Sequence, residues 1–309
     1  MSEDVEYPNC HQINTKTKDI LIVIFTSISF ILNLIITIIW IIYRKENSSK
    51  LFHFYLNILY CNFGHLFSYN ILYFFYGFNH DKKINNFLCK FQAIIIGTLH
   101  IAQDFLVFFL GISFYFSITQ YVEINNKIKF YYYLISYCLP FLSMLILYQQ
   151  DILGYNSDYC FISIENWDNL NFTLFSIYCV KWSLFILTII FLIISLIKIK
   201  KNKISILEKD NLKKNAWNIY IYSLIQFIND LPPSIFRIFA IYYFLNDKHR
   251  CVFDPNINTI TFCVIGIIFP IVFAYLSGLI NNLFNLKNDN IDDSDIISYN
   301  ELIPKNIVQ

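Results

Sequence analysis

The sequence has few charged residues for its length. Only 15% of its 309 residues are Asp, Glu, Lys or Arg, whereas 56% are hydrophobic and the mean hydropathy is +0.49. A soluble globular domain usually carries about 25% charged residues, because they cover its surface. A chain with so little polar surface is not expected to be a water-soluble globule, and we expect a multi-pass protein embedded in a lipid membrane.

Three other signals are missing. The net charge is only +1, which argues against a nucleic-acid partner, because such proteins usually present a basic face. The first residues, Met1–Glu6, are acidic and include no basic residue, so a cleaved signal peptide is not expected. No two cysteines have the Cys-x-x-Cys spacing of zinc sites, and neither a metal nor another cofactor is expected.

The sequence contains seven long apolar runs. Each run contains the roughly 20 residues that a helix needs to cross the hydrocarbon core of a bilayer. The predicted spans are 20–43, 51–78, 87–121, 128–150, 172–197, 215–245 and 256–286. The sequence therefore predicts an all-α membrane protein, a seven-transmembrane helix bundle, with an extracellular segment at 1–19 and a short cytoplasmic tail at 287–309.

Lys and Arg residues are distributed unequally between the predicted loops. With the N-terminus outside, fourteen of them fall on the inner side and seven on the outer side. Cytoplasmic loops are enriched in positive residues, so this topology, with the C-terminus inside, is favoured. We expect the plasma membrane as the location. The sequon at Asn171 then faces outside and is a predicted glycosylation site.

Four of the eight cysteines fall on the predicted outer side, and an even number in an oxidising compartment favours two disulfides. Cys89 opens the third span, and Cys160 lies in the loop between the fourth and fifth spans. A Cys89–Cys160 bond would tie that loop over the mouth of the bundle. Cys10 and Cys251 remain for a second bond, between the N-terminal segment and the last outer loop.

Several segments resemble the social-amoeba cyclic-AMP receptor family of G-protein-coupled receptors. The strongest are FLCKFQAI (87–94), FYYYLISYCLPFLSMLI (130–146) and DYCFIS (158–163). FRIF (236–239) and INNLF (280–284) are similar to family motifs in spans six and seven, with Phe236 and Leu283 where the family has Asn and Pro.

The resemblance implies a receptor rather than an enzyme. Such a receptor senses an extracellular small molecule, for which a cyclic nucleotide is one option, and activates a heterotrimeric G protein. The Lys-rich inner loop at 198–214 is the expected contact with the G protein, although positive-inside charge alone also explains its lysines.

Polar residues inside the predicted spans form the candidate ligand-binding site. A charge near the middle of a bilayer costs about 2.5–3.5 kcal/mol even on a lenient scale, so such groups are expected to face the bundle interior and to have partners. Gly97 and Gly111 share a helical face with two of them and would allow neighbouring helices to approach closely. The predicted site residues are His100, Gln103, Asp104, Lys181, Asp230 and Arg237.

Two interpretations of these charges stay open. In the first, Asp104, Asp230, Lys181 and Arg237 only pair with one another and fix the positions of the helices. In the second, Arg237 and Lys181 bind an anionic ligand, and the two carboxylates are their resting counter-ions.

A transporter of small solutes is the alternative to a receptor, because odd-numbered bundles also carry solutes. The sequence lacks the Pro-Gln pair and the triple-helix repeat expected of small seven-span carriers. An enzyme is not expected, because the titratable residues inside the spans do not have the spacing of hydrolase or metalloprotease motifs.

Overall fold

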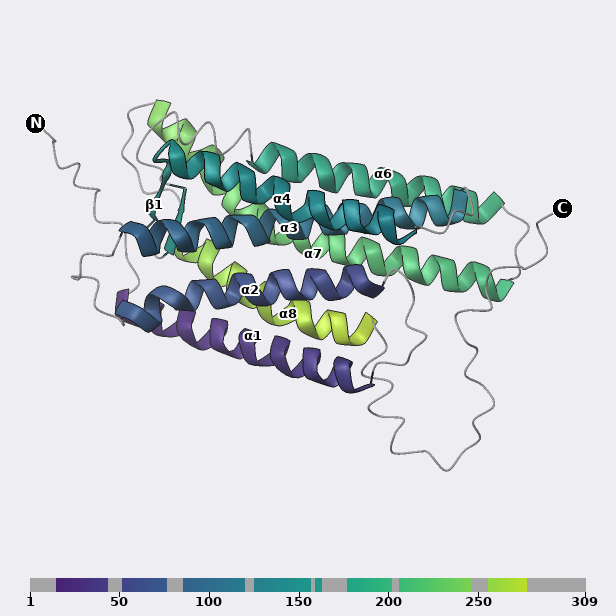
Figure 1. The fold of residues 1–309 in the computed structure, drawn as a ribbon, viewed down its shortest axis with the longest axis horizontal. Helices are drawn as coiled ribbons and strands as arrows, with labels where there is room; N and C mark the ends of the chain where they lie inside the picture. The colour runs from purple at the N-terminus through teal and green to yellow at the C-terminus, as the bar shows by residue number, and fades with distance from the viewer. Residues whose placement is uncertain are drawn as a thin grey trace, which may run out of the picture.

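The structure is a computed structural model, and it describes residues 15–43, 52–76, 86–119, 125–156, 159–162, 177–201, 206–245 and 255–276. These residues are almost entirely helical. Seven long helices lie within them: α1 (Thr15–Tyr43), α2 (Phe52–Tyr76), α3 (Asn86–Thr119), α4 (Asn126–Gln149), α6 (Cys179–Lys201), α7 (Ile206–Leu245) and α8 (Pro255–Leu276). The helices lie lengthwise beside one another (Figure 1).

The helix bounds lie close to the predicted spans, with one larger difference within the described residues. α7 begins at Ile206 rather than at 215, because the residues before 215 include Leu, Glu and Lys, which are good helix formers. α6 begins at Cys179, directly after a π-helical turn at 177–178, and residues 172–176 of the fifth predicted span lie outside the described residues. Residues 277–286 of the last predicted span lie outside the described residues.

Three helices within the described residues are long and apolar enough to cross a membrane. They are Phe87–Thr119, Asn126–Gln149 and Cys179–Lys201, and Val23–Ile39 and Gly266–Tyr275 are shorter apolar segments. The outward faces are apolar too, with Leu142 of α4 55% exposed and Ile186 of α6 56% exposed. Exposed faces of this kind suit lipid rather than water. The prediction of a helical membrane protein is therefore confirmed for these three helices.

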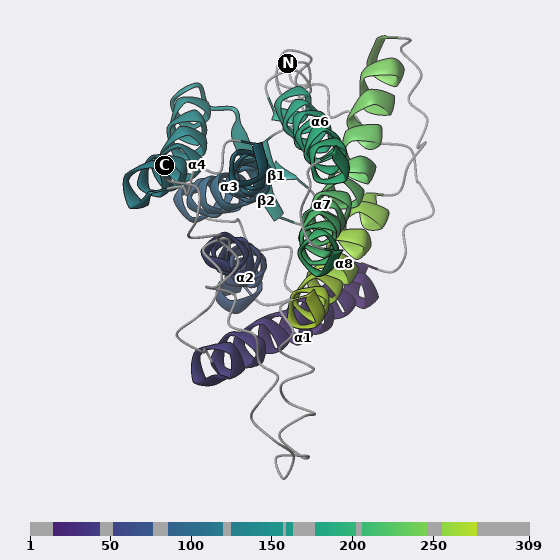
Figure 2. The same cartoon turned by 90° about the vertical axis from the view of Figure 1, so that its right-hand side faces the viewer.

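α3 lies at the centre of the arrangement. It contacts α2, α4, α6 and α7, whereas α8 lies against α1, α2 and α7 (Figure 2). α4 lies at the edge, packed mainly on α3. A residue on α3 can therefore reach several helices, depending on its helical face.

Two glycines of α3 mark close helix contacts. A methyl group on Gly97 would lie 2.5 Å from Met144 Cε of α4, and one on Gly111 would lie 3.0 Å from Thr188 Cγ2 of α6. The predicted close approach is therefore present. The two glycines serve different neighbours, however, because α3 is surrounded on several sides.

A small β-hairpin adds to the predicted all-α architecture. β1 (Leu153–Asn156) pairs antiparallel with β2 (Tyr159–Ile162), and Tyr155 lies opposite Cys160. Asp151 has a φ of 57°, a left-handed conformation that Asp tolerates better than most residues, and it turns the chain from the end of α4 into β1. The hairpin packs on α3 near the start of that helix (Figure 1).

Among the described residues, the interior contains two apolar clusters, and polar side chains are buried beside them. Phe54, Phe114, Tyr222, Phe269 and Phe273 are almost fully buried in the larger hydrophobic cluster. A second cluster under the hairpin contains Ala93, Met144, Phe161 and Ile177. The buried polar side chains include Asn33, Asn62, His65, Gln92, Gln103, Asp104, Lys181 and Asp230. A bundle with apolar outer faces and polar groups inside positions those groups for interaction with one another.

Candidate functional site

A charged cluster joins the three helices α3, α6 and α7. Lys181 of α6 places its Nζ 2.6 Å from Asp230 Oδ1 of α7 and 3.3 Å from Asp104 Oδ2 of α3. His100, one turn before Asp104 on α3, has its Nε2 2.8 Å from the same Asp230 oxygen. One ammonium group therefore contacts two carboxylates, and one carboxylate contacts both a lysine and a histidine.

These groups are shielded from solvent. The side chains of Lys181, Asp230 and Asp104 are 1%, 4% and 6% exposed, and that of His100 is 13% exposed. Coulombic interactions are stronger at such a site than at the surface, because little water screens them. The contacts between α3, α6 and α7 therefore depend on the charge states of these four residues.

A small cavity adjoins the cluster. Its volume is about 20 Å³, and its lining includes Trp182, Ser223 and Gln226 besides Asp104, Lys181 and Asp230. That volume holds about one water molecule, whereas a pocket for a drug-sized ligand has about 300–1,000 Å³. An organic ligand could enter here only if α6 and α7 moved apart from α3.

The structure brings together four of the six predicted site residues: His100, Asp104, Lys181 and Asp230. Gln103 is buried at 2% exposure on α3, but it does not line the cavity. Arg237 belongs to α7, about two turns after Asp230, and its side chain lies outside the described residues. The contacts of Lys181 agree both with a purely structural pairing and with carboxylates that act as resting counter-ions.

Other residues of the site were not predicted as ligands. Ser223 and Gln226 lie seven and four residues before the predicted Asp230 on α7, so helical periodicity could have placed them on its face. The His65 ring of α2 lies 4.9 Å from the His100 ring, measured between centroids. Nothing in the spacing of these two histidines along the chain indicates that they meet.

A second arrangement fixes the hairpin to the bundle. Cys89 of α3 and Cys160 of β2 form a disulfide with a Cα–Cα distance of 5.1 Å. The exposed Asp151 pairs with Lys90, whose ammonium also lies 5.5 Å from the centre of the Tyr148 ring. The predicted partners Cys10 and Cys251, and the predicted glycosylation site Asn171, lie outside the described residues.

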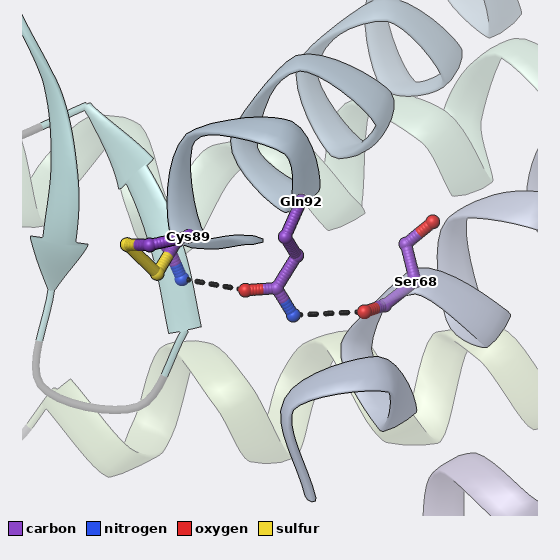
Figure 3. The surroundings of a disulfide bond; sticks show 4 residues. Ser68, Cys89 and Gln92 are labelled. Atoms are coloured by element: carbon purple, nitrogen blue, oxygen red, sulfur yellow. Dashed lines mark hydrogen bonds between the residues drawn. A yellow bond between two sulfur atoms is a disulfide. The ribbon is translucent and has the colours of Figure 1, made fainter. Parts of the chain in front are cut away.

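Gln92 holds the hairpin and α2 together from inside. Its Oε1 accepts a 2.9 Å hydrogen bond from the Cys160 backbone N–H, and its Nε2 donates a 2.8 Å bond to the Ser68 carbonyl of α2. Gln92 is fully buried. Figure 3 shows the side chain reaching from α3 between the strand and α2, beside the disulfide. Sequence reasoning missed this residue, because both of its partners are backbone groups of distant segments.

The residues that the structure describes include no group of three or more His, Cys, Asp or Glu side chains placed to hold a metal ion. Neither protein-family models nor curated proteins match this sequence.

Proposed function

We propose that the chain is a seven-span receptor that senses an extracellular small molecule and activates a heterotrimeric G protein. The observation that carries this proposal is the hairpin held on the end of α3 by the Cys89–Cys160 disulfide and by Gln92. A covalently fixed lid at one end of a central helix can contact a ligand and pass its effect along that helix. In this proposal the chain lies in the plasma membrane, with residues 1–19 and the hairpin on its outer side.

The charged cluster connects α3 to α6 and α7, the helices proposed to shift when a ligand binds. Lys181 and Asp230 link α3 to α6 and α7, the two helices that continue toward the Lys-rich segment 198–214. Lys198, Lys200 and Lys201 lie in the last turn of α6 and are exposed. A change in how α6 and α7 meet α3 would therefore alter the surface offered to the G protein.

The proposed ligand is a small anion, and a cyclic nucleotide is the first one to test. Lys181 and Arg237 are the proposed cationic contacts, with His100 and Gln103 as hydrogen-bonding groups. The cavity holds about one water molecule as it stands. Ligand entry would thus separate Lys181 from Asp104 or Asp230, which couples binding to the position of α6.

Reconstitution tests the proposal. The full-length chain, in lipid vesicles with a heterotrimeric G protein, is exposed to a panel of cyclic nucleotides, folate-like compounds and small carboxylates. The proposal expects at least one compound to accelerate guanine-nucleotide exchange, and the Arg237→Ala variant to lose that response. If no compound in the panel accelerates exchange, while one of them is transported, the receptor proposal fails.

A small-solute transporter is the second candidate. The observation that favours it is the set of ionisable groups buried between α3, α6 and α7, because carriers and pumps use such Asp, His and Lys groups along their solute and proton paths. Counter-flow of a labelled solute into vesicles that contain the chain, with no G protein present, would support this candidate instead.

A further inference from the structure

Among the described side chains, the buried cluster carries an unbalanced charge. With Lys181 as ammonium, Asp104 and Asp230 as carboxylates and His100 neutral, its net charge is −1. An unpaired charge in the membrane interior is costly, and groups in that situation usually take up or lose a proton instead. One additional proton makes the cluster neutral.

The surroundings add no further cation within the described residues. His65 of α2 faces His100, and Cys61 of α2 lies near Asp104. Two adjacent imidazoles do not both become positive at low cost, because like charges repel. Arg237 lies about two turns further along α7, with its side chain outside the described residues. For the side chains that the structure describes, taking up a proton is therefore the balance that the geometry offers.

The cavity can hold a water molecule as part of the same site. Trp182 Nε1 and Gln226 Nε2 are buried donors on the cavity lining, and Gln226 lies beside the Asp104 carboxyl group. Asp104 Oδ2 has its ion-pair contact with Lys181 at 3.3 Å and has room for a further donor. A water in the 20 Å³ cavity could accept from a donor and donate to this carboxylate.

We propose that His100, Asp104, Asp230 and Lys181, with one water in the adjoining cavity, form a proton-binding site that holds one exchangeable proton at neutral pH. The site goes beyond the proposed function, because it exists whether the chain is a receptor or a transporter. Loss of the proton leaves a negative cluster at the junction of α3, α6 and α7. The packing of these helices, and any ligand response that depends on it, then varies with pH.

The sign of the pH effect follows from proton counting. Above about pH 7.5 the unfolded chain holds almost no protons on these carboxylates and few on the histidines. Each proton that only the folded state holds lowers the folding equilibrium constant tenfold per pH unit as pH rises. Wild type should therefore lose stability with rising pH above about pH 7.5, for as long as the folded state keeps its proton.

Two variants change the proton number in opposite directions. Asp104→Asn leaves one Lys and one Asp, so the cluster is neutral with no added proton, and the tenfold decrease per pH unit should disappear. Lys181→Met leaves two carboxylates, which need two protons, so the decrease should steepen by a further tenfold per unit. Asp210→Asn, at an exposed carboxylate of α7, is the matched control and should keep the wild-type slope.

The measurement is the folding equilibrium constant of the full-length chain in bicelles, titrated with a denaturing detergent at each pH. A purely structural role of either residue lowers stability by the same factor at every pH and leaves the slope unchanged. A wild-type slope retained in Asp104→Asn, or in Lys181→Met if the first variant does not fold, overturns the proposal. A wild-type constant that does not decrease with pH overturns it without any variant. Neither result depends on the G-protein assay, so the two proposals fail independently.

Discussion

Lys181 Nζ lies 2.6 Å from Asp230 Oδ1 and joins α6 to α7 inside the bundle. The same ammonium lies 3.3 Å from Asp104 of α3, so a single side chain connects three helices. Asp104 is 77 positions and Asp230 is 49 positions from Lys181 along the chain, and only the fold brings them together. The relationship explains how such polar residues are accommodated in apolar helices.

Removing Lys181 alone should destabilise the bundle more than removing Lys181 together with one of its two carboxylate partners. Lys181→Met leaves two carboxylates facing each other, and breaking a buried pair in this way costs about 3–5 kcal/mol. Adding Asp230→Asn removes one of them, so the double variant should regain part of the loss. Yield of folded protein and unfolding free energy in bicelles measure the effect.

The exposed pair Lys213–Asp210 of α7 is the control for that experiment. Its atoms lie 3.2 Å apart at 57% and 64% exposure, so the equivalent changes should cost no more than about 1 kcal/mol. If the Lys181→Met/Asp230→Asn double variant loses as much as the two single variants together, the two side chains are not coupled.

The hairpin disulfide should behave as one unit. Cys89→Ser and Cys160→Ser are each expected to lower stability by about 2–5 kcal/mol, and the double variant should lose no more, because both single changes remove the same bond. Cys138→Ser, at an exposed free cysteine of α4, should have no such effect. Peptide mapping without reductant should recover residues 89 and 160 as a linked pair, and free thiols at both positions would contradict the arrangement.

Gln92 should be important for holding the hairpin. Gln92→Leu keeps an apolar filler but leaves the Cys160 N–H and the Ser68 carbonyl without this partner, at about 1–3 kcal/mol for each buried group. The Cys89–Cys160 bond should then be reduced faster by an added thiol, which mass spectrometry can follow. The matched control is Gln149→Leu, at the exposed end of α4. Equal reduction rates in both variants would show that Gln92 does not restrain the strand.

The segment 198–214 should be needed for coupling but not for ligand binding. Replacing it with a neutral linker removes seven lysines at the proposed inner ends of α6 and α7. Nucleotide exchange stimulated by the active compound from the panel should be lost, while saturation binding of that compound, labelled, stays within about twofold, which is less than about 0.5 kcal/mol. Stimulated exchange at the wild-type rate would remove this segment from the mechanism.

Much of the fold follows from the sequence because apolar run length and charge placement are local signals. The runs that contain Leu106 and Leu192 predict helices correctly, and the buried position of Asp104 follows from the cost of a charge in lipid. The spacing of polar residues on a helix indicates which face is inside. It does not indicate which other helix meets that face.

The features that sequence reasoning missed depend on contacts between distant segments. Gly97 and Gly111 were placed on a common face, yet they meet α4 and α6 respectively, because α3 is surrounded. The hairpin at 153–162 has strands of only four residues, too short to show an alternating pattern. Gln92 resembles any polar residue at the start of a helix until its two backbone partners are known.

The orientation of the bundle underlies the receptor proposal, because the hairpin must face outside and the lysines of 198–214 must face inside. Antibody staining of tagged chains in intact cells tests this directly, with one tag at residue 1, one at residue 309 and one inserted between residues 203 and 204. The proposal predicts staining of the N-terminal tag without permeabilisation, and of the other two only after it. Staining of the residue 203 tag or the C-terminal tag on intact cells would contradict a seven-span receptor with its lid outside.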